Sequence, residues 1–217
     1  MTLTDRIDAF KAAYPDTPAA WPWLTREDNR DVLYGVWVLG NDYRNAEQYY
    51  GTYPPRYLDR VLALFPDVAP TDTLHAFSGA LPKGDYTRID RNPLLNPDVV
   101  GDIFDAPRLF GERRFQLEIA DPPYSVYDAA KYQALCDGTL DWRLAPKAKP
   151  DLATPALNQR RATSALASVL APGGFLAWLD TSWPMHSKTE LVTVGRIYLQ
   201  RSTQHRIRAC HLFERVA

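Results

Sequence analysis

Phe115-Gln116-Leu117-Glu118-Ile119-Ala120-Asp121-Pro122-Pro123-Tyr124 is the segment from which the organisation of this chain can be worked out. Apolar Phe115, Leu117 and Ile119 alternate with polar residues, which predicts a β-strand. The two prolines end that strand, because proline has no N–H to donate and its φ is fixed. A carboxylate and a phenol therefore follow the C-terminal end of a strand, where ligands bind in open α/β sheets.

Strand patterns also occur upstream, at 74–79, 85–90 and 99–104. Each of these segments has a glycine turn or an aspartate at or near its end. The second ends in Asp90, and the third contains Asp102. The carboxyl ends of parallel strands meet at one edge of a sheet. We therefore expect Asp90, Asp102 and Asp121 to lie near one another.

The links between these predicted strands are short. Eight residues, 78–85, separate Phe77 from Tyr86, whereas a parallel crossover normally takes a dozen or more residues, usually as a helix. We expect an α/β fold with a mostly parallel sheet in which some crossover helices are reduced. Two β-rich runs at 191–200 and 206–215 predict a C-terminal antiparallel hairpin.

Residues 1–66 are expected to form an N-terminal helical extension that packs on the core, and residues 67–217 to form the α/β domain. Within the extension, helical spacing and N-cap residues predict three helices, at 4–14, from Thr25 to Leu39, and from Pro54 to Phe65.

Composition indicates an ordinary soluble globular protein, with 217 residues, 46% hydrophobic and 24% charged. A net charge of −1 gives no global attraction to nucleic acid, so such contacts would need a local patch. The two cysteines and four histidines show no metal-ligand spacing, and we expect no metal. The chain shows neither a membrane-spanning segment nor a signal-peptide pattern, so a cytoplasmic protein is expected.

Asp121-Pro122-Pro123-Tyr124 resembles the catalytic motif of class I S-adenosylmethionine-dependent amino-methyltransferases, in particular the N6-adenine DNA methyltransferases. The resemblance covers roughly residues 50–200. It implies a Rossmann-like sheet, S-adenosylmethionine as cofactor, and methyl transfer to the exocyclic amine of a nucleic-acid base. Family usage of aspartate at the first motif position favours adenine N6 in DNA. Catalytic roles are implied for Asp121, Pro122, Pro123 and Tyr124.

The chemistry of amine methylation fits these residue types. An exocyclic amine is a weak nucleophile, because its lone pair is delocalised into the ring. A carboxylate and a backbone carbonyl that accept its N–H bonds favour the nucleophilic form. The Tyr124 ring is expected to stack on a base that has left its helix. On the residues alone a tight turn after a buried strand remains an alternative, since proline and aspartate are ordinary turn residues.

The resemblance also implies a set of cofactor-binding residues. Asp90 would accept from the ribose hydroxyls and Asp102 from the adenine amine, with Ile103 and Phe104 beside the ring. The family's fuller glycine pattern is not kept, because Leu81 stands where a second glycine is expected. A tyrosine-proline element ahead of a helix contacts the methionine end of the cofactor in this family. The full implied set is Tyr53, Pro54, Phe77, Ser78, Gly79, Asp90, Asp102, Ile103 and Phe104.

Residues 136–151 form a polar insertion after the predicted catalytic motif and offer side chains for nucleic-acid contact: Trp142, Arg143, Lys147 and Lys149. A solvated surface loop explains that composition equally well. Three other functions remain open. The chain could methylate a guanine or adenine amine in RNA, modify a small molecule or a protein amide, or be a degenerate module that binds nucleic acid without catalysis.

Overall fold

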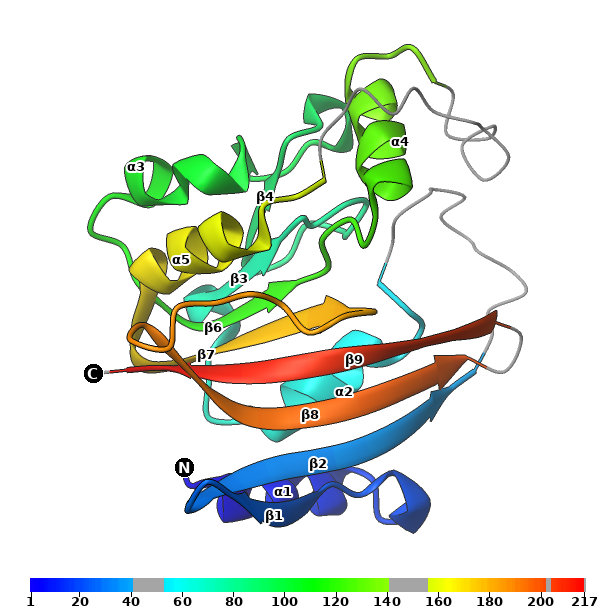
Figure 1. Ribbon diagram of the computed structural model, residues 1–217, viewed down its shortest axis with the longest axis vertical. Helices are drawn as coiled ribbons and strands as arrows, with labels where there is room; N and C mark the ends of the chain where they lie inside the picture. Colours follow the sequence, from blue (N-terminus) through cyan, green and yellow to red (C-terminus); the bar gives the residue numbers. More distant parts are fainter. Residues whose placement is uncertain (41–52, 141–155, 202–203, 217) are drawn as a thin grey trace.

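The computed structural model describes residues 1–40, 53–140, 156–201 and 204–216, which build a nine-stranded sheet in the order β1-β2-β8-β9-β7-β6-β3-β4-β5 (Figure 1). The strands are β1 (Trp23–Glu27), β2 (Arg30–Leu39), β3 (Thr73–Ala76), β4 (Thr87–Asp90), β5 (Val99–Val100), β6 (Phe115–Ala120), β7 (Leu170–Asp180), β8 (Leu191–Arg201) and β9 (Gln204–Arg215). The helices are α1 (Leu3–Ala13), α2 (Tyr57–Leu64), α3 (Ala106–Phe110), α4 (Val126–Cys136) and α5 (Gln159–Val169), with 3-10 turns η1 (Pro18–Ala20), η2 (Pro70–Asp72), η3 (Pro93–Leu95) and η4 (Ile103–Asp105).

The parallel part of the sheet changes direction between β3 and β6. From β3 the order runs through β4 to β5 on one side, and from β6 to β7 on the other, with parallel pairing throughout. Rossmann-like sheets bind ligands at such a switch point, outside the carboxyl ends of the strands. β9 pairs antiparallel with both β7 and β8. The predicted fold class, a mostly parallel Rossmann-like sheet with a C-terminal antiparallel hairpin, is confirmed.

The crossovers on the β4 side of the switch point are reduced, as the short links predicted. The link from β3 to β4 holds no helix, and the link from β4 to β5 holds only η3. The prediction of a strand over 99–104 is wrong beyond Val100. There the side chain of Asp102 accepts a hydrogen bond of 3.0 Å from the Phe104 N–H and caps η4, a local bond that competes with strand pairing.

The N-terminal extension is helical only in part. α1 and α2 form where helices were predicted, but the helix expected from Thr25 is wrong, because β1 and β2 form an antiparallel hairpin. Asp28 and Asn29 have φ values of 46° and 62°, the positive values that a two-residue type I′ turn requires. Burial alternates from Leu33 to Leu39, and β2 pairs in parallel with β8. The division of the chain at residue 66 stays a prediction.

Apolar cores lie on both faces of the sheet. α1 and α2 cover one face, where Phe10 and Val61 pack with Ile119 of β6. α3 and α5 cover the other face, where Leu166 packs with Trp178 of β7. Among the helices in the described parts of the chain, none is long and apolar enough to cross a membrane.

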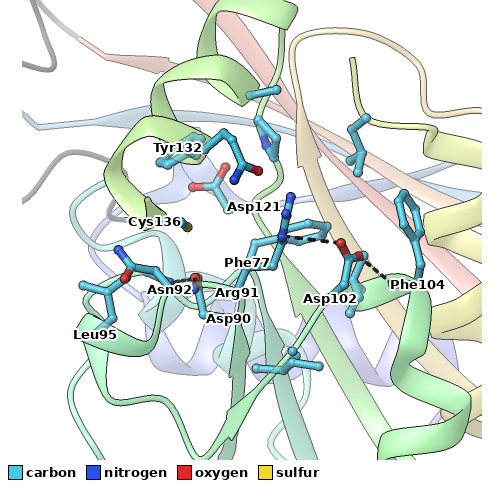
Figure 2. A pocket seen from close by; sticks show the side chains of 18 of the residues that line it. Phe77, Asp90, Arg91, Asn92, Leu95, Asp102, Phe104, Asp121, Tyr132 and Cys136 are labelled. Atoms are coloured by element: carbon cyan, nitrogen blue, oxygen red, sulfur yellow. Dashed lines mark hydrogen bonds and ion pairs between the residues drawn. The ribbon is translucent and has the colours of Figure 1, made fainter. Parts of the chain in front are cut away.

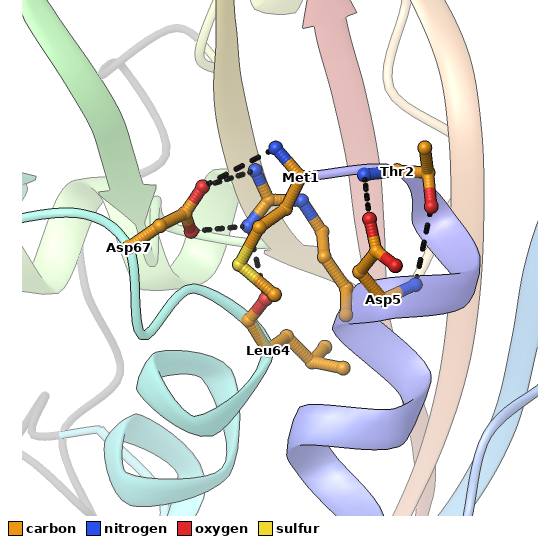
Figure 3. A network of polar contacts seen from close by, with 6 residues as sticks. Met1, Thr2, Asp5, Leu64 and Asp67 are labelled. Carbon is orange, nitrogen blue, oxygen red and sulfur yellow. Dashed lines mark hydrogen bonds and ion pairs between the residues drawn. The ribbon is translucent and has the colours of Figure 1, made fainter.

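A buried guanidinium joins α1 to the end of α2 (Figure 3). Arg6 donates to both carboxylate oxygens of Asp67, at 2.8 and 3.2 Å, and to the Leu64 carbonyl at 3.1 Å. Its guanidinium carbon also lies 4.5 Å from the ring centroids of Phe65 and Phe175. Because bidentate pairs of this kind are directional, they fix α1 relative to both α2 and the sheet.

Glu118 in β6 is a buried carboxyl group. It has no exposed surface, and neither carboxylate oxygen has a hydrogen-bond partner within the described structure. Burial raises the pKa of Glu118 well above its ordinary value, and the positive charge of Arg215 opposes that shift only in part.

Replacing Glu118 with glutamine should therefore stabilise the protein increasingly as pH rises. The folded state keeps a proton that the unfolded chain releases above a pKa of about 4.3, so the wild type loses about 1.4 kcal/mol per pH unit from there up to the folded pKa. Glutamine does not titrate. Urea unfolding of both proteins at a series of pH values above about 5 should show the difference widening with pH, and a constant difference would contradict the prediction.

Candidate functional site

A cavity of about 560 Å³ opens at the switch point of the sheet (Figure 2). Its walls come from the ends of β3, β4, β5 and β6, from α4, and from the residues that precede α5. The lining residues are Phe77, Gly79, Ile89, Asp90, Arg91, Asn92, Leu95, Gly101, Asp102, Ile103, Phe104, Asp121, Pro123, Ala129, Tyr132, Gln133, Cys136, Ala156, Leu157 and Asn158. This volume is suited to a nucleoside-sized ligand.

The turn after β3 forms one wall and is conformationally unusual. Phe77 has a φ of 55°, which is rare for a bulky aromatic residue, and Gly79 has a φ of 54°. Asp90 at the end of β4 holds this turn, because its Oδ2 accepts a hydrogen bond of 2.8 Å from the Gly79 N–H. Such strained positions persist only where the surrounding structure determines them, and they gather at ligand sites.

Asp90 is largely enclosed and ties two segments together. Besides the Gly79 bond, its Oδ1 accepts from the Asn92 N–H at 2.9 Å. Burial raises the pKa of Asp90, although the backbone hydrogen bonds from Asn92 and Gly79 act in the opposite direction. Arg91 adds a third backbone hydrogen bond. Two carboxylate oxygens have about four lone pairs, so acceptor capacity remains for a ligand in the cavity.

Asp102 and Arg91 form an ion pair in the wall of the cavity. The Arg91 Nε lies 3.4 Å from the Asp102 Oδ2, while the other oxygen caps η4. Phe104 follows on η4, and the guanidinium carbon of Arg161 in α5 lies 4.3 Å from its ring centroid. This wall therefore combines a carboxylate with an aromatic ring, and Figure 2 shows both lining the same side of the cavity.

Asp121 follows β6 directly and also faces the cavity. Burial raises its pKa to about 6, while the charge of Arg208 and a hydrogen bond from Tyr124 act in the opposite direction. The Tyr124 hydroxyl donates that bond to the Asp121 Oδ1. At neutral pH the side chain is therefore mostly a carboxylate, as an acceptor of amine protons must be.

Eight of the residues singled out from the sequence line the cavity: Phe77, Gly79, Asp90, Asp102, Ile103, Phe104, Asp121 and Pro123. Five others are not among the lining residues: Tyr53, Pro54, Ser78, Pro122 and Tyr124. Ser78 and Pro122 are buried, and the Tyr53 hydroxyl donates to the Ile119 carbonyl at 3.1 Å. The hydrogen bond from the Tyr124 hydroxyl to Asp121 was not predicted from the sequence. Stacking of the Tyr124 ring on a base stays a prediction.

The expected nucleic-acid contacts Trp142, Arg143, Lys147 and Lys149 lie outside the described residues. Within the described ranges, no three His, Cys, Asp or Glu side chains are grouped so as to hold a metal ion.

One wall of the cavity was missed by the sequence interpretation. Ala129, Tyr132, Gln133 and Cys136 of α4 all line it. Their spacing of i, i+3, i+4 and i+7 marks a single helix face directly after the Asp-Pro-Pro-Tyr motif, so a signal for their joint position was present. Burial raises the pKa of the Cys136 thiol to about 11, which keeps it neutral.

No protein-family model matches the chain, and no curated protein is significantly similar to it. Solved structures with some likeness include TrmN from Thermus thermophilus, with a TM-score of 0.49 and 12% identity over 76% of this chain. Another is the T. thermophilus 16S rRNA N2 methyltransferase RsmC in complex with AdoMet and guanosine, with a TM-score of 0.36 and 15% identity over 90% of this chain. The chain spans 50% of the length of each. The fold assignment rests on the strand order and pairing described above.

Proposed function

We propose that the chain is an S-adenosylmethionine-dependent methyltransferase that acts on the exocyclic amine of a nucleic-acid base, adenine N6 in DNA. The position of Asp121 carries the proposal. It opens Asp-Pro-Pro-Tyr at the C-terminal end of β6, beside the switch point, and faces a cavity that Asp90 and Asp102 also line. The ends of β4 and β6 and the start of η4 thus bring three carboxylates to one cavity.

The charge of the cavity fits a cationic cofactor better than a phosphate-bearing one. Three carboxylates face it, and Arg91 supplies the one guanidinium among its described lining residues. Dinucleotides place their phosphates on a helix N-terminus after the first strand, but the link from β3 to β4 has no helix. The sulfonium of S-adenosylmethionine needs no such cradle and is complementary to carboxylates.

The walls also offer a place for each end of that cofactor. In this proposal Asp90 accepts from the ribose hydroxyls through its remaining lone pairs. Asp102 accepts from the adenine amine, and Ile103 and Phe104 pack against the ring. The turn at Phe77 and Gly79 lies beside the methionine end, with Tyr53 and Pro54 behind it.

Bound S-adenosylmethionine supplies an electrophilic methyl group. The protein residues hold the target amine and raise its nucleophilicity. Asp121 accepts one N–H bond, and a backbone carbonyl of the proline-stiffened motif accepts the other, so positive charge that develops on nitrogen is stabilised. Because Pro122 and Pro123 have fixed φ values, these acceptors need little reorganisation.

The proposal is tested by incubating the protein with methyl-labelled S-adenosylmethionine and DNA, RNA or free nucleosides. Label in N6-methyladenine of DNA is expected, with unpaired or mismatched sites ahead of perfect duplex, since the target base must leave its stack. Label only in RNA would move the substrate to an RNA base. Calorimetric binding of the cofactor without transfer to any substrate would favour a degenerate module.

A further inference from the structure

Arg208 lies on β9, which is far from the Asp-Pro-Pro-Tyr motif in the sequence, yet its side chain contacts that motif. Its guanidinium carbon lies 4.9 Å from the ring centroid of Tyr124. β9 pairs antiparallel with β7, with Ala209 opposite Asp180, and this register brings Arg208 to the carboxyl edge of the sheet. A guanidinium over an aromatic face is attracted by the ring.

Arg208 provides the favourable charge in an otherwise acidic surrounding. Among the groups that act on Asp121, Asp180 at the end of β7 and Asp128 on α4 are like charges that disfavour its ionisation. The phenols of Tyr53 and Tyr57 also interact with Asp121 and remain neutral, because burial raises the pKa of each well above its ordinary value. Arg208 and the hydrogen bond from Tyr124 are what favour the carboxylate.

We infer that Arg208 is a positioning residue for the proposed reaction: its cation keeps Asp121 charged, and its contact with the Tyr124 ring keeps the hydroxyl on Asp121. This inference rests on the proposed function, because the charge matters if Asp121 accepts an N–H bond of the target amine. The arrangement brings a residue of β9 to the motif that follows β6.

The test compares Arg208→Gln with Arg208→Lys, with Arg196→Gln as the matched control. Arg196 is a suitable control because its guanidinium also stacks on aromatic rings, 3.8 Å from the Trp183 centroid and 5.8 Å from that of Tyr34, away from the motif. The Asp121 carboxyl is titrated by carbon NMR in protein with labelled aspartate, and its resonance is assigned from its loss in Asp121→Asn. Arg208→Met, which keeps apolar contact with Tyr124, replaces Arg208→Gln if that variant does not fold.

The pH midpoint of the Asp121 titration should rise by about one pH unit in Arg208→Gln, because removal of an opposite charge disfavours the carboxylate. It should return most of the way in Arg208→Lys and stay unchanged in Arg196→Gln. The acid limb of the methyl-transfer rate should move by the same amount, with cofactor affinity unchanged. An unshifted midpoint in Arg208→Gln, or an equal shift in Arg196→Gln, would overturn the inference. If no substrate is methylated, the proposed function fails while the NMR titration still decides the role of Arg208.

Discussion

Asp121→Ala is expected to lower the methyl-transfer rate by at least about a hundredfold, which is the typical cost of removing one preorganised electrostatic partner of the reacting group. Cofactor affinity should change little, because the proposed partner of Asp121 is the target amine. Asp121→Asn keeps one carbonyl acceptor in place and should retain more activity than the alanine variant. The rates are measured with labelled cofactor under saturating conditions. Near-normal turnover in Asp121→Ala would remove the catalytic role.

The same carboxylate should destabilise the folded protein at neutral pH. Burial raises the pKa of Asp121 to about 6. The unfolded value is about 3.9, so the folded state holds a proton that the unfolded chain has lost, and stability falls as pH rises between these values, by at most about 3 kcal/mol. Asp121→Asn should therefore be more stable than the wild type near pH 8 and gain less near pH 4. Such a trade of stability for function is common at catalytic groups.

Asp90→Ala is expected to weaken binding of S-adenosylmethionine by about 1.5 to 3 kcal/mol for each charge-assisted hydrogen bond lost, about tenfold to a hundredfold in Kd per bond. The loss has a second source. Asp90 also accepts from the Gly79 and Asn92 N–H groups, so its removal releases the turn after β3. Isothermal calorimetry measures the affinity.

Asp98 supplies a matched control for this experiment. It forms an ion pair of 3.0 Å with Arg88 of β4 but does not line the cavity. Asp98→Ala should reduce stability while it leaves cofactor affinity unchanged. Asp90→Asn, which keeps one acceptor oxygen, should fall between the wild type and Asp90→Ala. Equal affinity in the wild type and Asp90→Ala would remove Asp90 from the cofactor site.

Local chemistry explains which parts of the site could be predicted from the sequence. Asp90 and Asp121 sit at the ends of strands with clear apolar patterns, so their common edge follows from the parallel topology. Arg208 has no such signal. It stands 87 residues after Asp121, and its approach to Tyr124 depends on the register of β9 against β7.

The N-terminal hairpin shows how a distant partner overrides a local pattern. Helical spacing fits Val32, Leu33, Val36 and Trp37 as well as a strand does, and that spacing together with the N-cap pattern at Thr25 predicted a helix. Pairing with β8 selects the strand, since it buries Leu33 and Trp37 beneath α1. Asp28 and Asn29 have the positive φ values of a hairpin turn, and both residue types are common in such turns. From the sequence, this segment was assigned to the start of a helix instead.

The pairing of β2 with β8 also determines when the protein can finish folding during its synthesis. Leu33 lies opposite Gly195, so 162 residues must be added before this pair can form. At about 5 to 20 residues per second, the ribosome takes roughly 8 to 30 seconds to supply them. During that interval β2 is paired with β1 along one edge, and its other edge has no strand to pair with. The first strands of the chain to be made are thus among the last to be placed.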